Sequence, residues 1–253
     1  MMISYAQNLE DVVLERVFRT QPTGFYIDVG AWDPDCDSVT KHFYLKGWSG
    51  INVEPTAFYF DRLLTVRPRD INLRVAVGNQ GVRTADFLQI DGTGWSGFAE
   101  TSSRHVIEKG GDAVRAITVN VMPLSEITSR YAPAQVDFLK IDVEGAERSV
   151  IESAEWQAFR PRVVVVEAVA PITNQPAWFG WEGLLLEVGY RLALFDGLNR
   201  FYYRAEEPEL RDALSVPANV LDEYCQVHFV AMQQRLAGLE ALVTQRPIAS
   251  NQN

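Results

Sequence analysis

Apolar residues follow two alternating spacings along the chain. Short apolar runs, typical of buried strands, lie at residues 25–29, 50–53, 71–77, 138–141 and 163–169. Apolar positions three or four residues apart, typical of helices, lie at residues 8–18, 38–45, 57–66, 146–159 and 181–188. This alternation predicts an α/β fold with a mostly parallel sheet and helices on both of its faces.

Two later segments, 191–195 and 201–203, flank a turn of Asp196-Gly197-Leu198-Asn199. They predict an antiparallel hairpin at one edge of the sheet, which then has seven strands. Residues 83–90 and 117–121 also alternate like strands, and a glycine-rich loop, DGTGWSG, occupies residues 91–97.

The pattern changes after Pro217. Apolar residues then recur at spacings of four and three, as in a coiled-coil seam: Cys225, Phe229, Met232, Leu236, Leu239 and Val243. A helix packed on its own domain explains this short seam equally well. We therefore expect one domain over residues 1–214, and a C-terminal helix with a disordered tail (246–253) over residues 215–253.

Composition narrows the class of protein. The 253 residues are 47% hydrophobic and 22% charged, which suits one globular core, and the net charge of −10 disfavours a nucleic-acid partner. Cys36 and Cys225 lie far apart, so neither a disulfide scaffold nor a thiolate metal site is expected. The chain has no signal-peptide pattern and no apolar stretch of membrane-spanning length. We expect a cytoplasmic protein.

The residues that follow the predicted strands suggest a ligand. Gly30 permits close backbone approach, and Glu54, at the end of the next strand, suits ribose hydroxyls. A dinucleotide fingerprint would need glycines at positions 32 and 35, where the chain has Trp32 and Asp35. The loop after Gly30 carries three carboxylates, Asp33, Asp35 and Asp37. They would repel a pyrophosphate but would accept the ammonium and sulfonium groups of S-adenosylmethionine.

Four segments resemble the FkbM family of methyltransferases. They read YAQNLEDVVL (5–14), GFYIDVGAWDPDCDSVTKHFYLKGWSGINVEP (24–55), DFLKIDVEGAE (137–147) and FDGLNRFYY (195–203). The resemblance implies a class I, Rossmann-like methyltransferase fold, S-adenosylmethionine as donor, and O-methylation of a sugar, glycan or natural-product hydroxyl. Trp32 departs from the family, whose members often carry Asn at this position.

The resemblance also implies a donor site. Carried over by position, its residues are Gln7, Asp11, Asp28, Gly30, Ala31, Ser38, Glu54, Pro55, Ala76, Val77 and Asp142. Glu54 would hold the ribose, whereas Gln7 and Asp11 would cover the pocket. Asp11 is equally well explained as an ordinary acid in the first turn of a helix.

Methyl transfer to a hydroxyl also needs a base or a metal ion. The carboxylates of Asp142, Glu144 and Glu167 follow or end adjacent strands and suit Mg²⁺ or Mn²⁺. Without a metal, Asp142 or Glu144 is the candidate base, with Lys140 as a stabilising charge and His42 as a further candidate. The alternative is structural: the acids stabilise a helix start, and Glu167 pairs with the buried Lys140.

Two other functions stay open at this point. One is a degenerate methyltransferase fold that serves as a binding or scaffolding module, and the other is an NAD-type oxidoreductase. The C-terminal helix is a candidate for homodimerisation or for fusion to a glycan-assembly protein. Trp95 is a candidate lid, and Asp196, Asn199 and Arg200 are candidate acceptor contacts, although turn chemistry also explains the hairpin residues.

Overall fold

The structure is a computed structural model that describes residues 1–101 and 104–244. Within these residues the main sheet has seven strands. Their spatial order is β11 (Tyr190–Phe195), β12 (Asn199–Arg204), β10 (Val163–Glu167), β9 (Phe138–Ile141), β2 (Phe25–Val29), β3 (Ser49–Val53) and β4 (Ile71–Leu73). In this described sheet β12 runs antiparallel to both of its neighbours, β10 and β11, so the sheet is mixed. The predicted α/β fold and edge hairpin are both present.

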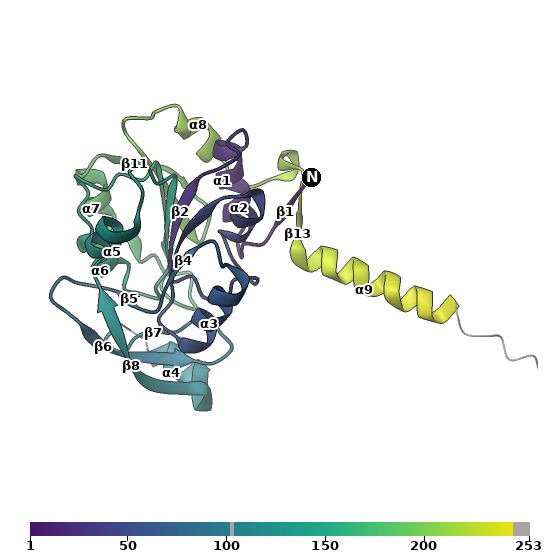
Figure 1. The fold of residues 1–253 in the computed structure, drawn as a ribbon, viewed down its shortest axis with the longest axis horizontal. Helices are drawn as coiled ribbons and strands as arrows, with labels where there is room; N and C mark the ends of the chain where they lie inside the picture. Colours follow the sequence, from purple (N-terminus) through teal and green to yellow (C-terminus); the bar gives the residue numbers. More distant parts are fainter. Residues whose placement is uncertain (102–103, 245–253) are drawn as a thin grey trace, which may run out of the picture.

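Helices cover both faces of the main sheet (Figure 1). One face packs against α5 (Leu124–Tyr131), α6 (Glu147–Glu152) and α7 (Glu182–Glu187), and the other against α1 (Glu10–Phe18), α2 (Lys41–Lys46) and α8 (Leu210–Leu214). In β10, Val164 and Val166 join the first core while Val163 and Val165 join the second. Burial on both faces explains the unbroken valine run of this strand. Helix α3 (Ala57–Val66) follows β3.

A second, smaller sheet lies beyond the carboxyl ends of the main strands (Figure 1). Its order is β5 (Ala76–Val77), β8 (Val114–Met122), β6 (Thr84–Ile90) and β7 (Gly97–Phe98), and α4 (Arg104–Gly110) lies beside it. This sheet has its own small core of Ala76, Phe87, Val119 and Val121.

Two predicted elements are wrong in length. The strand expected over residues 71–77 is split into two strands. Residues 71–73 pair with β3, whereas Ala76 and Val77 pair with β8 of the other sheet. The helix expected over residues 146–159 is only Glu147–Glu152. It ends there because the carbonyl and hydroxyl oxygens of Ser153 accept hydrogen bonds from the backbone of Ser125 and Leu124, at the start of α5.

The C-terminal region starts on the domain and then leaves it. Strand β13 (Tyr224–Gln226) pairs in parallel with β1 (Met2–Ser4), and α9 (Val227–Thr244) extends away from the body (Figure 1). Phe229, Met232, Leu236 and Leu239 are all more than half exposed, so they do not pack on the domain. The tail predicted over residues 246–253 lies outside the described residues. No described helix combines the length and apolar character of a membrane span.

Candidate active site

A cavity of about 650 Å³ lies at the carboxyl ends of β2, β3, β9 and β10. From β2 the chain proceeds to β3 and β4 on one side, whereas β9 pairs with β2 on the other side. Ligands of open α/β sheets bind at such a switch point. Eleven of the residues expected at the site line the cavity: Gln7, Gly30, Ala31, Glu54, Pro55, Ala76, Val77, Lys140, Asp142, Glu144 and Glu167.

Gly30 sits where the backbones of two neighbouring strand ends touch. Its φ is +81°, and a Cβ there would lie 1.8 Å from the carbonyl oxygen of Asp142. The amides of Gly30 and Ala31 both donate to the carbonyl of Val53, each at 3.1 Å. Only glycine satisfies this backbone conformation and this contact, so the turn after β2 has a fixed shape.

Glu54 is a buried carboxylate at the cavity wall. Its Oε1 accepts hydrogen bonds from the amide and hydroxyl of Thr56, at 2.8 and 2.5 Å, and its Oε2 accepts the amide of Trp32 at 3.1 Å. Burial raises the pKa of Glu54, although the bonds from Thr56 and Trp32 oppose that shift. These contacts fix the carboxylate at the edge of the turn that Gly30 begins.

Lys140 connects this turn to the next strand end. From inside β9 its Nζ donates to the carbonyl of Gly30 at 3.2 Å and lies 3.3 Å from Asp142 and 3.5 Å from Asp28. Burial alone would lower the pKa of Lys140, but the Asp142 and Asp28 carboxylates outweigh burial and raise it. The ammonium therefore stays charged. The pairing predicted between Lys140 and Glu167 is not among its ion pairs; Asp28 and Asp142 take that role.

Three carboxylates converge on one side of the cavity. One oxygen each of Asp142, Glu144 and Glu167 lie within 4.8 Å of one another. Burial and then the charge of Asp142 raise the pKa of Glu144 to about 9, and the same two causes raise the pKa of Glu167 well above its usual value. Among the described residues, the buried Glu144 Oε2 and Glu167 Oε2 have no hydrogen-bond partner. Such a cluster holds either shared protons or a cation.

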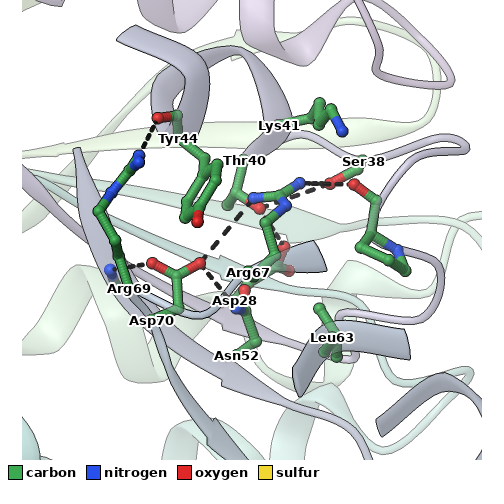
Figure 2. Close-up of polar contacts among 12 residues, drawn as sticks. Asp28, Ser38, Thr40, Lys41, Tyr44, Asn52, Leu63, Arg67, Arg69 and Asp70 are labelled. Carbon is green, nitrogen blue, oxygen red and sulfur yellow. Dashed lines mark hydrogen bonds and ion pairs between the residues drawn. The ribbon is translucent and has the colours of Figure 1, made fainter. Parts of the chain in front are cut away.

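A buried arginine braces the loop between β2 and α2, as Figure 2 shows. The guanidinium of Arg67 donates to the carbonyl of Pro34 at 2.7 Å and to the hydroxyl of Ser38 at 3.0 Å, and lies 3.9 Å from Asp70. Asp70 also accepts a bond from the hydroxyl of Tyr26 at 2.7 Å. Ser38 is therefore bound into this cluster, which lies behind the loop, and it does not line the cavity.

Three more expected site residues lie outside the cavity lining. Asp28 accepts the hydroxyl of Thr40 at 3.0 Å. Asp11 accepts the hydroxyl of Ser4 and the amide of Tyr5, at 2.6 and 2.8 Å. His42 lies 3.2 Å from Glu15 and lines a separate surface pocket. None of the three lines the cavity, and among the described residues only Asp28 forms an ion pair with a lining residue, Lys140.

The sequence did not single out several lining residues. Trp32 and Tyr59 lie with ring centroids 5.4 Å apart beside Glu54, and the loop after β10 contributes Ile172, Thr173 and Asn174. An aromatic in the first turn of the helix that follows Glu54 was a usable signal for Tyr59. The loop residues offered none.

The glycine-rich loop and the hairpin turn both contribute to the cavity lining. Trp95 lines it, and Lys109 lies 4.8 Å from the centroid of the Trp95 ring. Of the hairpin turn, Leu198 lines the cavity. Asn199 instead donates to the buried Glu10 at 2.7 Å, and Arg200 pairs with Glu182.

The known proteins that this chain is similar to are methyltransferases. A family model described as "Methyltransferase FkbM domain" matches residues 28–192. No curated protein matches the chain. Among solved structures, the chain is similar to a TehB-like SAM-dependent methyltransferase from Corynebacterium glutamicum (9% identity, 76% of this chain and 87% of that one, TM-score 0.41). It is also similar to a precorrin-6y C5,15-methyltransferase from Geobacter metallireducens (13% identity, 80% and 94%, TM-score 0.39).

Proposed function

We propose a function from one premise: this chain belongs to the FkbM methyltransferase family. On this premise it methylates a hydroxyl of a sugar or glycan acceptor. The family implies S-adenosylmethionine as methyl donor. The observation that carries the proposal is the cavity at the switch point. There a fixed turn at Gly30, the buried Glu54 and a cluster of three acids face one space of about 650 Å³.

The donor fits the side of the cavity that Gly30 and Glu54 form. Because Gly30 has no side chain, a ligand can approach its backbone closely. Glu54 offers carboxylate oxygens to ribose hydroxyls, and Trp32 and Tyr59 offer aromatic faces beside it. When bound, S-adenosylmethionine supplies a methyl group on a positively charged sulfur. The negative charge of Asp142, which also lines this space, favours such a cation.

The acceptor fits the side that the three acids form. A sugar hydroxyl must lose its proton as it attacks the methyl carbon, so a proton acceptor has to lie beside it. Asp142 is one candidate, because its carboxylate lies 3.3 Å from the ammonium of Lys140, which orients it. The raised pKa of Glu144 makes this carboxyl a stronger base once it is ionised. The loop with Thr173 and Asn174 adds polar groups that suit a sugar.

The same acids suit a divalent cation. One oxygen from each lies within 4.8 Å of the others, and two of their buried oxygens have no partner among the described residues; carboxylate oxygens are the ligands that Mg²⁺ and Mn²⁺ prefer. Such an ion would let Glu144 and Glu167 ionise together, and it would lower the pKa of a bound hydroxyl. Asp142, Glu144 and Glu167 are then its ligands, and Lys140 orients Asp142.

The test combines donor binding with an acceptor screen. Calorimetry should detect S-adenosylmethionine but not NADH, and Glu54→Gln should weaken the donor about tenfold. A screen of nucleotide sugars with labelled donor, with and without EDTA, should yield a methylated product. Glu144→Gln should abolish turnover while retaining donor affinity, and the exposed Glu187→Gln should change neither.

Three outcomes would overturn parts of the proposal. No donor affinity in the native chain would favour the scaffolding module, and NADH binding would favour the oxidoreductase. Turnover that survives EDTA at full rate would remove the metal and leave the acids as bases. The absence of any methylated sugar, despite donor binding, would overturn the acceptor class.

The proposal extends to a second copy of the chain at α9. If Phe229 and Leu236 take the a positions of a heptad, Met232 and Leu239 take the d positions. Arg235 then occupies a g position, and Glu240 the e position five residues later. In a parallel pair these charges face each other across the seam, which favours a homodimer. Fusion to a glycan-assembly protein and a cytoplasmic location remain predictions.

A further inference from the structure

A second cluster of possible metal ligands lies outside the acid cluster. Cys36 and Asp37 belong to the loop after β2, whereas His228 is the second residue of α9. One ligand atom from each, a sulfur, a carboxylate oxygen and an imidazole nitrogen, lie within 4.8 Å of one another. The chain folds them together because β13 pairs with β1 and ends two residues before His228.

The surrounding charges leave Asp37 available for a ligand. Asp33 pairs with Arg62, and Asp35 pairs with Arg62 and Lys41. Within the part of the chain that the structure describes, no ion pair engages Asp37. Its backbone has a φ of +50°, which is uncommon for a residue other than glycine. Asp37 also lines the edge of the candidate active site.

We propose that Cys36, Asp37 and His228 bind Zn²⁺. Thiolate, imidazole and carboxylate are the three ligand types that zinc takes in proteins. Ligand atoms around a tetrahedral zinc ion lie roughly 3.5 Å apart, so small side-chain rotations bring these atoms into place. Three protein ligands leave the fourth position to water. On binding, the thiol of Cys36 releases its proton to solvent.

This ion differs from the one at the acid cluster. Asp142, Glu144 and Glu167 present only oxygen, which suits hard cations, whereas sulfur and nitrogen select zinc. Zinc at Cys36 would fasten the first turn of α9 to the loop that borders the donor site. It would therefore set the direction in which α9 leaves the domain. This proposal is independent of the methyl-transfer chemistry.

The experiment measures zinc on the full chain, with excess Mg²⁺ present to occupy the acid cluster. The metal-free protein should bind one Zn²⁺ in competition with a zinc-sensing dye. Cys36→Ser and His228→Gln should each weaken this binding roughly tenfold or more. Co²⁺ should give a sulfur-to-cobalt charge-transfer band that disappears in Cys36→Ser. Circular dichroism confirms that each variant is folded.

Cys225→Ser is the matched control, because Cys225 is the chain's other free, half-buried thiol. It should bind zinc as the native chain does. Failure of the native protein to bind one zinc ion would overturn the proposal. So would unchanged affinity in Cys36→Ser, or an equal loss in Cys225→Ser, which would indicate adventitious binding to surface thiols.

Discussion

Glu10 gives the sharpest quantitative prediction, because its carboxyl is buried at the start of α1. Its two oxygens accept bonds from the amide of Asn8 at 2.9 Å and from the side chain of Asn199 at 2.7 Å. Burial is the main cause that raises its pKa from 4.5 to about 7, and the nearby Asp196 adds to it. We expect Glu10→Gln to stabilise the protein at neutral and alkaline pH.

The sign follows from proton binding. Between pH 4.5 and about 7 the folded chain holds the Glu10 proton while the unfolded chain has lost it, so stability falls as the pH rises through this window. The penalty is about 1.4 kcal/mol at pH 5.5 and about 3.3 kcal/mol at pH 8. Glutamine is never charged. Its carbonyl oxygen can accept the amide of Asn8, and its NH2 group can donate to the side-chain oxygen of Asn199 once the Asn199 amide has flipped, so both hydrogen bonds are kept. The advantage of the variant should thus grow by about 2 kcal/mol between these pH values.

Urea unfolding of both proteins at several pH values measures this difference. Glu15→Gln, on the same helix, is the control of opposite sign. The hydrogen bonds of His42 and Lys46 and the charge of Lys46 outweigh burial and lower the pKa of Glu15, so the loss of this carboxylate should destabilise the chain at pH 8. A pH-independent difference between Glu10→Gln and the native chain would refute the reasoning.

Three further predictions concern the loop, its brace and the C-terminal helix. Gly30→Ala should abolish donor binding, since the new Cβ meets the backbone carbonyl of Asp142. The control Gly81→Ala has a similar φ but open space around it, so it should lower the free energy of unfolding by only about 1 kcal/mol and leave donor binding unchanged. Arg67→Met should destabilise the chain by about 3–5 kcal/mol in urea unfolding, because it removes the counter-ion of the buried Asp70 carboxylate and the donors to Pro34 and Ser38. Arg62→Met, at a more exposed pair, should cost less than about 1 kcal/mol. Leu236→Glu should convert a dimer into a monomer in light scattering with an unchanged circular dichroism spectrum. A native chain that is already monomeric would contradict the proposed pairing.

The sequence predicted the main sheet well, because burial on both faces leaves a clear apolar pattern in strands such as β10. It failed where tertiary contacts decide an element's length. Ser153 ends α6 by bonding to α5, and the strand after β3 divides when Ala76 and Val77 pair with β8. Three-residue strands such as β1 have no periodicity to detect.

The candidate site was predictable where residues directly follow a strand, as Gly30, Glu54 and Asp142 do. It was not predictable where a side chain turns away from the cavity. Ser38 hydrogen-bonds a buried arginine that is distant in sequence, and no local pattern records that partner. The approach of His228 to Cys36 is a similar long-range result of folding.

The small sheet beyond the main one has a consequence for substrate choice. Residues 91–96, which include Trp95, connect β6 to β7 of the small sheet, and Gly92 to Ser96 line the cavity. Gly30, Glu54 and Asp142, by contrast, directly follow strands of the main sheet. Substitutions within residues 91–96 can therefore reshape the part of the cavity wall that contains Trp95, and with it the choice of bound molecule, while the strand ends that position Gly30, Glu54 and Asp142 stay unchanged.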